Sequence, residues 1–247
     1  MLKLENVSFR VDDGTESLEI IDGVSLEIPD GSFTVITGPN GGGKSTLARL
    51  IMGIEKPTSG KIYFDDIDIT DMSVTERARL GIGYAFQQPP RFKGLTVRKL
   101  LSLAHGSELP EDECCAYLTS VGLCSREYLN REVDSSLSGG EAKRVEIATL
   151  MARQLKMAIF DEPEAGIDMW SFSMLVETFG SMSRNGSGRT TLVISHQERI
   201  MQLADELIII ADGKVKTRGS RDEIFPLITG QFESPCTFRG KEGTENG

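Results

Sequence analysis

Residues 38–45 place the strongest limit on the fold of this chain, because they match the pattern G-x-x-x-x-G-K-[ST]. Residues 33–37, just before them, form a short apolar run typical of a buried strand. Residues 46–52, just after them, have the pattern of a helix that ends at Gly53. A strand, a glycine-rich loop and a helix in this order present backbone N–H groups and a helix N-terminus to a phosphate. The sequence therefore predicts an α/β fold of the P-loop nucleoside triphosphatase (NTPase) type.

The same loop predicts how a nucleotide and its metal ion are held. Lys44 would reach the β- and γ-phosphates of ATP, which makes it a catalytic candidate, and the Ser45 hydroxyl would ligate Mg²⁺. We expect ATP and Mg²⁺ as cofactors. The nucleotide-binding residues predicted from the loop are Gly38, Pro39, Asn40, Gly41, Gly42, Gly43, Lys44, Ser45 and Thr46.

Composition and charge exclude several classes of function. The 247 residues carry a net charge of −10, so the chain lacks the basic surface that nucleic-acid phosphates require. The longest apolar runs, such as residues 207–211, have the length of a strand and are too short to cross a bilayer. Residues 1–5 show none of the apolar segment of a signal peptide. We expect a cytoplasmic protein with no nucleic-acid partner and no direct membrane insertion.

The remaining pattern predicts a nucleotide-binding core with antiparallel strands beside it. Residues 2–10 and 18–28 are strand-like, and residues 61–69 have the pattern of a short hairpin. Asp212-Gly213 predicts a second, later hairpin. Further strand-like runs alternate with helical stretches, as a mostly parallel sheet requires, and lie at residues 157–160, 191–195 and 207–211.

Residues 88–146 change to helical periodicity, which predicts a helical subdomain inserted into the core. We therefore expect a single domain over residues 1–230. Residues 231–247 are polar, contain glycine and have no period, so we expect a loose C-terminal tail. The predicted core then comprises residues 1–87 and 147–230.

Two acids follow an apolar strand, as P-loop hydrolysis requires. After residues 157–160, Asp161 would hold Mg²⁺ through its water shell. Glu162 is aimed differently and would act as the general base on the attacking water. Acids at a strand tip also occur without any function, but a P-loop in the same chain favours the hydrolytic interpretation.

Residues 137–141 read Leu-Ser-Gly-Gly-Glu, and they precede a helical pattern at residues 142–153. This forms a second helix start that can bind an anion. With this signature motif the chain resembles the ATP-binding cassette (ABC) family over about residues 2–228. In that family the signature binds the γ-phosphate held by a partner subunit. The resemblance implies an ATP-dependent head-to-tail homodimer in which the residues acting across the interface are Ser138, Gly139, Gly140 and Glu141.

The resemblance also implies roles for single residues elsewhere. Gln87 matches the Q-loop glutamine that touches Mg²⁺, and Asp168 matches the D-loop that crosses the dimer interface. His196 matches the switch histidine that contacts the γ-phosphate, and Val11 stands where many transporter ATPases stack an aromatic residue on adenine. The implied Mg²⁺ ligands are Ser45, Gln87 and Asp161, and the implied catalytic residues are Glu162, His196 and Lys44.

Several residues resemble the SufC branch of the family, the ATPases of iron-sulfur cluster assembly, more than the transporter ATPases. Acids stand at Glu141 and Glu146, where the transporter pattern is Q-x-Q-R-V-A-I-A. Residues 128–133 and the Gly-Ile-Asp of residues 166–168 are also similar to SufC. Pro163 departs from that branch and is transporter-like.

The SufC resemblance implies that two ATPase subunits close and reshape a SufB-like scaffold protein on which a cluster is built. The alternative is the ATP-binding subunit of an importer-like ABC membrane transporter, whose partner is a permease. A regulatory nucleotide-binding module that barely hydrolyses ATP is disfavoured by Glu162. Residues 89–93, beside Gln87, form either the partner-contact segment or an ordinary proline-rich loop.

Overall fold

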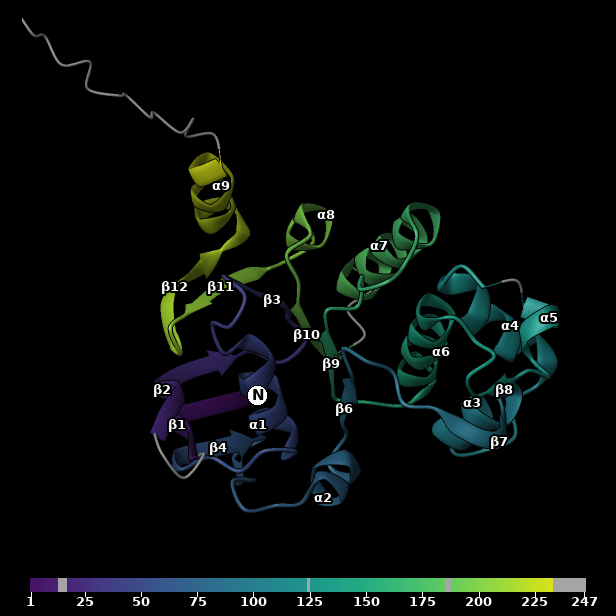
Figure 1. Ribbon diagram of the computed structural model, residues 1–247, viewed down its shortest axis with the longest axis horizontal. Helices are drawn as coiled ribbons and strands as arrows, with labels where there is room; N and C mark the ends of the chain where they lie inside the picture. Colours follow the sequence, from purple (N-terminus) through teal and green to yellow (C-terminus); the bar gives the residue numbers. More distant parts are fainter. Residues whose placement is uncertain (13–16, 124, 185–187, 233–247) are drawn as a thin grey trace, which may run out of the picture.

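A six-stranded sheet with the order β12-β11-β3-β10-β9-β6 lies at the centre of the molecule (Figure 1). The computed structural model describes residues 1–12, 17–123, 125–184 and 188–232. Neighbouring strands are parallel except for β12, which is antiparallel to β11, so the prediction of a mostly parallel sheet is confirmed. The strands are β3 (Phe33–Thr37), β6 (Ile82–Ala85), β9 (Met157–Asp161), β10 (Thr190–Ile194), β11 (Glu206–Ala211) and β12 (Lys214–Ser220).

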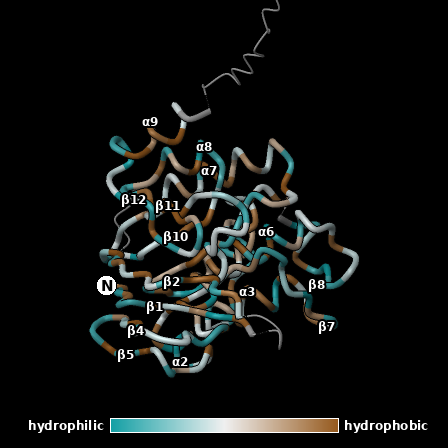
Figure 2. Tube along the Cα trace, turned by 60° about the vertical axis from the view of Figure 1, so that its left-hand side comes forward, coloured by the Kyte–Doolittle hydropathy of each residue, from teal (hydrophilic) through white to brown (hydrophobic). Residues whose placement is uncertain are grey.

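The middle strands are buried because both faces of the sheet are covered. Every residue of β3, β9 and β10 is buried, which explains their unbroken apolar runs. On one face Phe179 packs edge to face against Phe33 and Phe160, with ring centroids 6.1 and 5.0 Å apart. Figure 2 shows hydrophobic residues along interior strands such as β10.

The predicted antiparallel strands form a second sheet, with the order β2-β1-β4-β5. Leu4 lies opposite Leu26 on one neighbouring strand and Ile62 on the other, and all three belong to a core shared with α1 (Lys44–Met52). Asp212 and Gly213 both have positive φ and join β11 to β12 in the predicted late hairpin. The strands of the second sheet are β1 (Leu2–Asp12), β2 (Ser17–Ile28), β4 (Ser59–Phe64) and β5 (Ile67–Asp68).

A buried arginine holds the C-terminal end of α1. Arg77 lies on α2 (Val74–Arg79) and is fully buried. Its Nη1 donates to the carbonyl oxygens of Leu50 at 2.6 Å and Ile51 at 2.8 Å, in the last turn of α1. The last carbonyls of a helix have no partner within the helix, and here Arg77 serves both, although the Leu50 carbonyl also accepts from the Gly53 N–H at 3.2 Å. Burial lowers the pKa of Arg77 to about 10, which leaves it charged at neutral pH.

The region between residues 88 and 146 is helical with one addition. Its helices are α3 (Val97–His105), α4 (Glu111–Ser120) and α5 (Ser125–Tyr128), and they lie to one side of the central sheet (Figure 1). β7 (Phe92–Thr96), just before α3, pairs antiparallel with β8 (Glu132–Val133), which follows α5. The sequence did not predict this small sheet because β8 has only two residues and Gly94 interrupts β7 with positive φ.

The remaining helices are α6 (Gly139–Ala152), α7 (Met169–Arg184), α8 (Glu198–Met201) and α9 (Arg221–Phe232). Helix α6 runs unbroken through residue 146, where the sequence placed a subdomain limit, so the domain limits remain predictions. Helix α9 includes the first two residues of the predicted tail, and residues 233–247 lie outside the described part. Among the described residues no helix is both long and apolar enough to span a membrane.

Candidate active site

Two glycines of residues 38–45, Gly38 and Gly43, are required by close contacts with neighbouring strands. Gly38 has φ of 132°, and a Cβ there would lie 2.0 Å from the carbonyl oxygen of Ile210. Gly43 has φ of 100°, and a Cβ there would lie 2.8 Å from Cδ1 of Ile21. Only glycine fits such positions without strain. The loop therefore lies directly against β2 and β11 and leads into α1.

A hollow of about 580 Å³ over this loop brings most of the predicted site residues together. Lys44 Nζ donates to the carbonyl oxygens of Gly38 and Pro39, both at 2.8 Å. Burial lowers the pKa of Lys44. The lining residues are Ile20, Asn40, Gly41, Gly42, Gly43, Lys44, Ser45, Thr46, Gln87, Glu162 and His196.

One predicted nucleotide-binding residue, Val11, is not among the described residues that line the hollow. Val11 is 46% exposed on β1, opposite Leu18. Ile20 of β2 lines the hollow instead, and it could not be predicted from the sequence because it has the pattern of an ordinary strand residue. The base-facing role of Val11 therefore stays a prediction.

Asp161, at the end of β9, lies beside the predicted Mg²⁺ ligand Ser45. Ser45 Oγ donates to Asp161 Oδ1 at 2.8 Å, and the Tyr84 hydroxyl donates to Oδ2 at 2.7 Å. Burial and the Asp161 charge raise the pKa of Tyr84, so it stays a donor. A hydroxyl next to a carboxylate is the oxygen donor set that Mg²⁺ prefers. Mg²⁺ is commonly held by one or two carboxylates together with the phosphates of a substrate, so this pair fits a magnesium–nucleotide complex.

Glu162 follows Asp161 directly, and its strained backbone turns its side chain away from that of Asp161. Its φ of 46° is unusual for a residue with a side chain, and such strain gathers at functional sites. Glu162 Oε2 accepts a hydrogen bond from Gln87 Nε2 at 2.6 Å, and both residues line the hollow. One carboxylate is therefore directed to Ser45 and the other to the open side of the site.

His196 lines the same hollow next to a half-buried acid, Glu164, that the sequence did not indicate. Glu164 Oε1 accepts from Ser195 Oγ at 2.6 Å and from the His196 N–H at 3.4 Å. Its other oxygen is buried without a hydrogen-bond partner among the described residues, and burial raises the pKa of Glu164. Burial, with Lys44 nearby, lowers the pKa of His196, so its ring is neutral at pH 7. The only feature of the sequence that could have pointed to Glu164 is its position two residues after Glu162.

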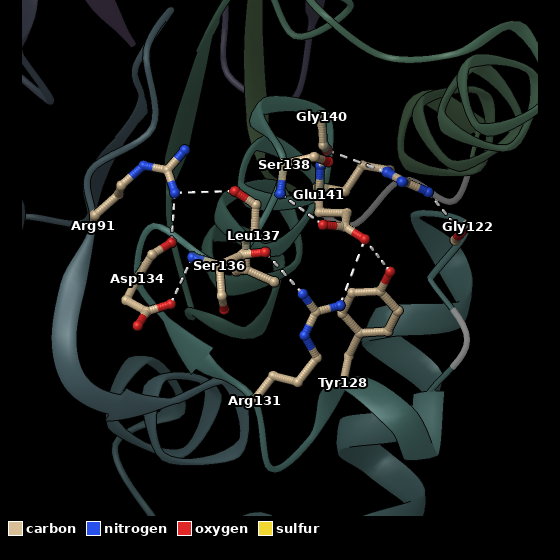
Figure 3. A network of polar contacts seen from close by, with 11 residues as sticks. Arg91, Gly122, Tyr128, Arg131, Asp134, Ser136, Leu137, Ser138, Gly140 and Glu141 are labelled. Carbon is tan, nitrogen blue, oxygen red and sulfur yellow. Dashed lines mark hydrogen bonds and ion pairs between the residues drawn. The ribbon is translucent and has the colours of Figure 1, made fainter.

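The signature motif caps α6, and its glutamate turns back into its own chain (Figure 3). Ser138 Oγ accepts from the Glu141 N–H at 3.2 Å, and Glu141 Oε2 accepts from the Ser138 N–H at 2.7 Å. The Tyr128 hydroxyl donates to Glu141 and lowers its pKa, and Arg131 lies 3.5 Å from the carboxylate. The Glu141 side chain is therefore engaged by residues of its own chain. Ser138 and the two glycines remain the residues predicted to bind the nucleotide of a second copy.

An arginine from the predicted partner-contact segment holds the loop before the signature. Arg91 donates to the carbonyl oxygens of Asp134 and Leu137 (Figure 3). The side chain of Arg91 is therefore engaged within the chain, whereas Phe92 beside it is exposed. Whether residues 89–93 contact a partner stays a prediction.

The D-loop touches the signature backbone to backbone. A Cβ at Gly140 would lie 2.4 Å from the carbonyl oxygen of Gly166. Arg144 Nε donates to the Gly140 carbonyl oxygen at 3.2 Å, and its Nη1 donates to Ser171 Oγ at 2.7 Å. Ser171 Oγ in turn donates to Asp168 Oδ2 at 2.7 Å, and the Ser171 backbone N–H, together with this hydroxyl, lowers the pKa of Asp168. Asp168 and the signature thus form one connected unit.

Lys143 and Glu146, on the buried side of α6, hold the start of the Q-loop. Lys143 Nζ donates to the carbonyl oxygens of Phe86 and, at 3.1 Å, Asp161. Glu146 Oε1 accepts from the Phe86 N–H at 2.9 Å. Burial raises the pKa of Glu146 to about 7 and lowers that of Lys143. The sequence marked Glu146 as unusual but gave no role for it, because its partner lies 60 residues away.

Comparison with known proteins identifies the family. A family model described as ABC transporter matches residues 21–165, more than half of the chain. The chain is 41% identical over 214 residues to MJ0035, an uncharacterized ABC transporter ATP-binding protein of Methanocaldococcus jannaschii, covering 83% of this chain and 85% of that protein. It is 32% identical to a probable sulfate/thiosulfate import ATP-binding protein, CysA, of Chlorella vulgaris, covering 93% and 95% of the two chains.

A solved structure agrees with the sequence comparison. The dimeric, post-hydrolysis structure of the ATP-binding cassette MJ0796, bound to ADP and Pi, superimposes with a TM-score of 0.80. The two chains are 28% identical, and the match covers 90% of this chain and 99% of the other. The chain therefore belongs to the ABC transporter family, and it is an ATP-hydrolysing cassette that uses ATP and Mg²⁺.

Proposed function

We propose that ATP is hydrolysed in the hollow over the P-loop by direct attack of water. Lys44 and the loop N–H groups hold the phosphates. Ser45 and Asp161 hold Mg²⁺, which neutralises charge on the phosphates. Glu162 takes the proton from the attacking water, so that ATP and water give ADP and phosphate. The observation that carries this proposal is that Glu162 lines the hollow beside Gln87 and apart from Asp161.

His196 and Gln87 complete the site by orienting groups around the γ-phosphate. A neutral His196 donates one ring N–H to a phosphate oxygen without adding a charge. Gln87 holds the Glu162 carboxylate in the free chain and moves to the metal when ATP arrives. These residues would lower the barrier by fixing the positions of reactants rather than by covalent chemistry.

The arrangement supports a site shared between two copies. Ser138, Gly139 and Gly140 are absent from the described residues that line the hollow of their own chain. Their helix start suits a phosphate, because exposed N–H groups and the positive end of α6 meet there. We infer that ATP held by one copy binds the signature of a second, as a dimer similar to that solved for MJ0796.

Dimer closure then acts on a partner protein, for which we propose the membrane subunit of an ABC transporter. The support is that MJ0035 and CysA are named as transporter ATP-binding proteins, and CysA as an import protein. An apolar hollow of about 140 Å³ beside the Q-loop offers a docking point, with Phe86, Pro90 and Phe92 among its lining residues. The chain would then work at the cytoplasmic side of the membrane.

A SufB-like scaffold for iron-sulfur cluster assembly is the second candidate partner. Glu146 favours it, since the acid resembles the SufC branch and here holds the Q-loop from α6. The docking hollow by itself suits either partner, because it shows only that an apolar segment fits there.

Purification of the tagged chain from its native cells, with and without detergent, tests the two partners. Recovery of a polytopic membrane protein only in detergent supports the transporter. Recovery of a soluble scaffold without detergent supports cluster assembly and overturns the transporter proposal. Phe92→Ser is the companion variant, because it removes an exposed side chain of the hollow and should release either partner without changing ATP binding.

A further inference from the structure

The first turn of α7 carries apolar side chains that its own chain leaves uncovered. Trp170 is 86% exposed and Met169 is 79% exposed, and Met174 is also exposed. Trp170 and Met174 lie four residues apart and therefore share one face of the helix. We call Met169, Trp170 and Met174 the Trp170 patch. Large apolar side chains that lie together in water commonly mark an interaction surface.

The opposite side of the same turn is fixed to the rest of the chain. Ser171 and Leu175 are buried. Arg199 lies over the Phe172 ring, 5.6 Å from its centroid, and donates to Ser173 Oγ at 3.0 Å. The Trp170 patch is therefore held by a rigid helix turn and does not depend on a loop for its position.

The patch begins directly after the D-loop. Asp168 Oδ1 accepts from the N–H groups of Trp170 at 3.1 Å and Ser171 at 3.0 Å, so the aspartate caps the helix that carries the patch. Ser171 and Arg144 connect this cap to Gly140 of the signature. The Trp170 patch and the signature are thus parts of one unit, which a second copy must approach to complete the nucleotide site.

We propose that the Trp170 patch is buried against a second copy of this chain when ATP brings two copies together. The inference rests on the proposed function, because it needs the ATP-dependent dimer. A second copy is favoured over other occupants by the continuity of the patch with the signature and D-loop, both of which a partner subunit would contact. Tryptophan and methionine are enriched at such interfaces, and tryptophan often supplies much of the binding energy.

The symmetry of the dimer doubles the number of buried Trp170 patches. In a two-fold interface each copy presents the same patch, so every closed dimer buries two copies of Trp170. The patch adds contact area that requires no nucleotide. It would therefore set how tightly the copies hold one another, while ATP sets whether they meet in the right orientation.

Trp170 is the only tryptophan in the chain and reports on its own burial. The test uses Glu162→Gln with ATP and Mg²⁺, to hold the dimer, and excites tryptophan alone. We expect the emission to shift to shorter wavelength and iodide quenching to fall, in step with the dimer fraction from light scattering. Trp170→Ser and Met169→Ser in the same background should raise the dimer Kd at least tenfold, whereas Trp170→Phe should raise it less.

Leu227→Ser is the matched control, because Leu227 is an exposed apolar residue on α9, and it should leave the dimer Kd unchanged. A dimer in which Trp170 emission and quenching stay as in the monomer overturns the inference and leaves the proposed function standing. A chain that stays monomeric with ATP and Mg²⁺ overturns both. Patch variants that dimerise normally but lose the partner protein assign the patch to that partner and overturn the inference.

Discussion

The Lys143 ammonium group lies 3.8 Å from the Glu146 carboxylate, three residues along the buried side of α6. Between them they hold both backbone groups of Phe86, since Lys143 binds its carbonyl and Glu146 binds its N–H. Gln87 follows at once, so the helix that starts at the signature also fixes the Q-loop. A movement of α6 on contact with a second copy would therefore reach the site directly.

Replacing only one member of the Lys143–Glu146 pair should lower the stability of the fold. Lys143→Met leaves the buried Glu146 carboxylate without its cation and should lower the free energy of unfolding by about 3 kcal/mol. The double variant Lys143→Met with Glu146→Leu removes both charges and should recover most of that loss. Urea unfolding without nucleotide measures the three proteins. Equal losses in the single and double variants would contradict a coupled pair.

Glu146 should also make stability depend on pH. Its pKa is raised from 4.5 to about 7 by burial, so the carboxyl stabilises the fold when protonated. That contribution is fully present below pH 4.5 and is lost as the pH rises through about 7, by up to about 3 kcal/mol. Glu146→Gln cannot titrate and should lack this decline. Unfolding free energies of both proteins between pH 5 and 8 give the comparison, and parallel curves would refute the assignment.

Removal of the proposed general base should nearly stop turnover. Glu162→Gln keeps the shape of the side chain and its contact with Gln87 but cannot accept a proton, so kcat should fall at least about 100-fold. Release of phosphate measures the rate, and binding of labelled ATP should persist. Glu113→Gln changes an exposed acid on α4 and should leave kcat as it is. Full activity in Glu162→Gln would assign the base elsewhere.

Glu164 should act through His196 rather than on the substrate. Glu164→Ala removes the acceptor of Ser195 Oγ and the His196 N–H, so kcat should fall about tenfold with little change in KM. Glu164→Gln keeps an oxygen acceptor at that place and should retain most of the activity. Steady-state kinetics of both variants, with melting curves as a check on folding, decide the point. An equal loss in both would indicate that the charge itself is needed.

The Glu141 side chain should matter for the helix start more than for charge. Glu141→Ala removes one arm of the capping box and the Tyr128 contact, and should cost about 1 kcal/mol of stability. Glu141→Gln can still accept from the Ser138 N–H and should cost less. Chemical unfolding measures both. An equal loss in the two variants would show that the ion pair with Arg131 dominates.

The sequence predicted the parts of the fold that rest on local pattern. The P-loop, the strand before Asp161 and the signature each need particular residues side by side, and the structure brings Ser45, Gln87 and His196 into one hollow. Residues whose partners are distant in sequence were missed. Lys143 and Glu164 are single charged residues in otherwise ordinary segments, and only the folded chain shows that they hold Phe86 and Ser195.

Arg77 gives the nucleotide-binding helix α1 a permanent anchor at one end. Its guanidinium group bonds the carbonyls of Leu50 and Ile51. The last turn of α1 is therefore attached to α2, while its first turn is attached through Ser45 to Asp161 of β9. Force from a bound phosphate would pass along α1 into α2 and the antiparallel sheet without unwinding the last turn.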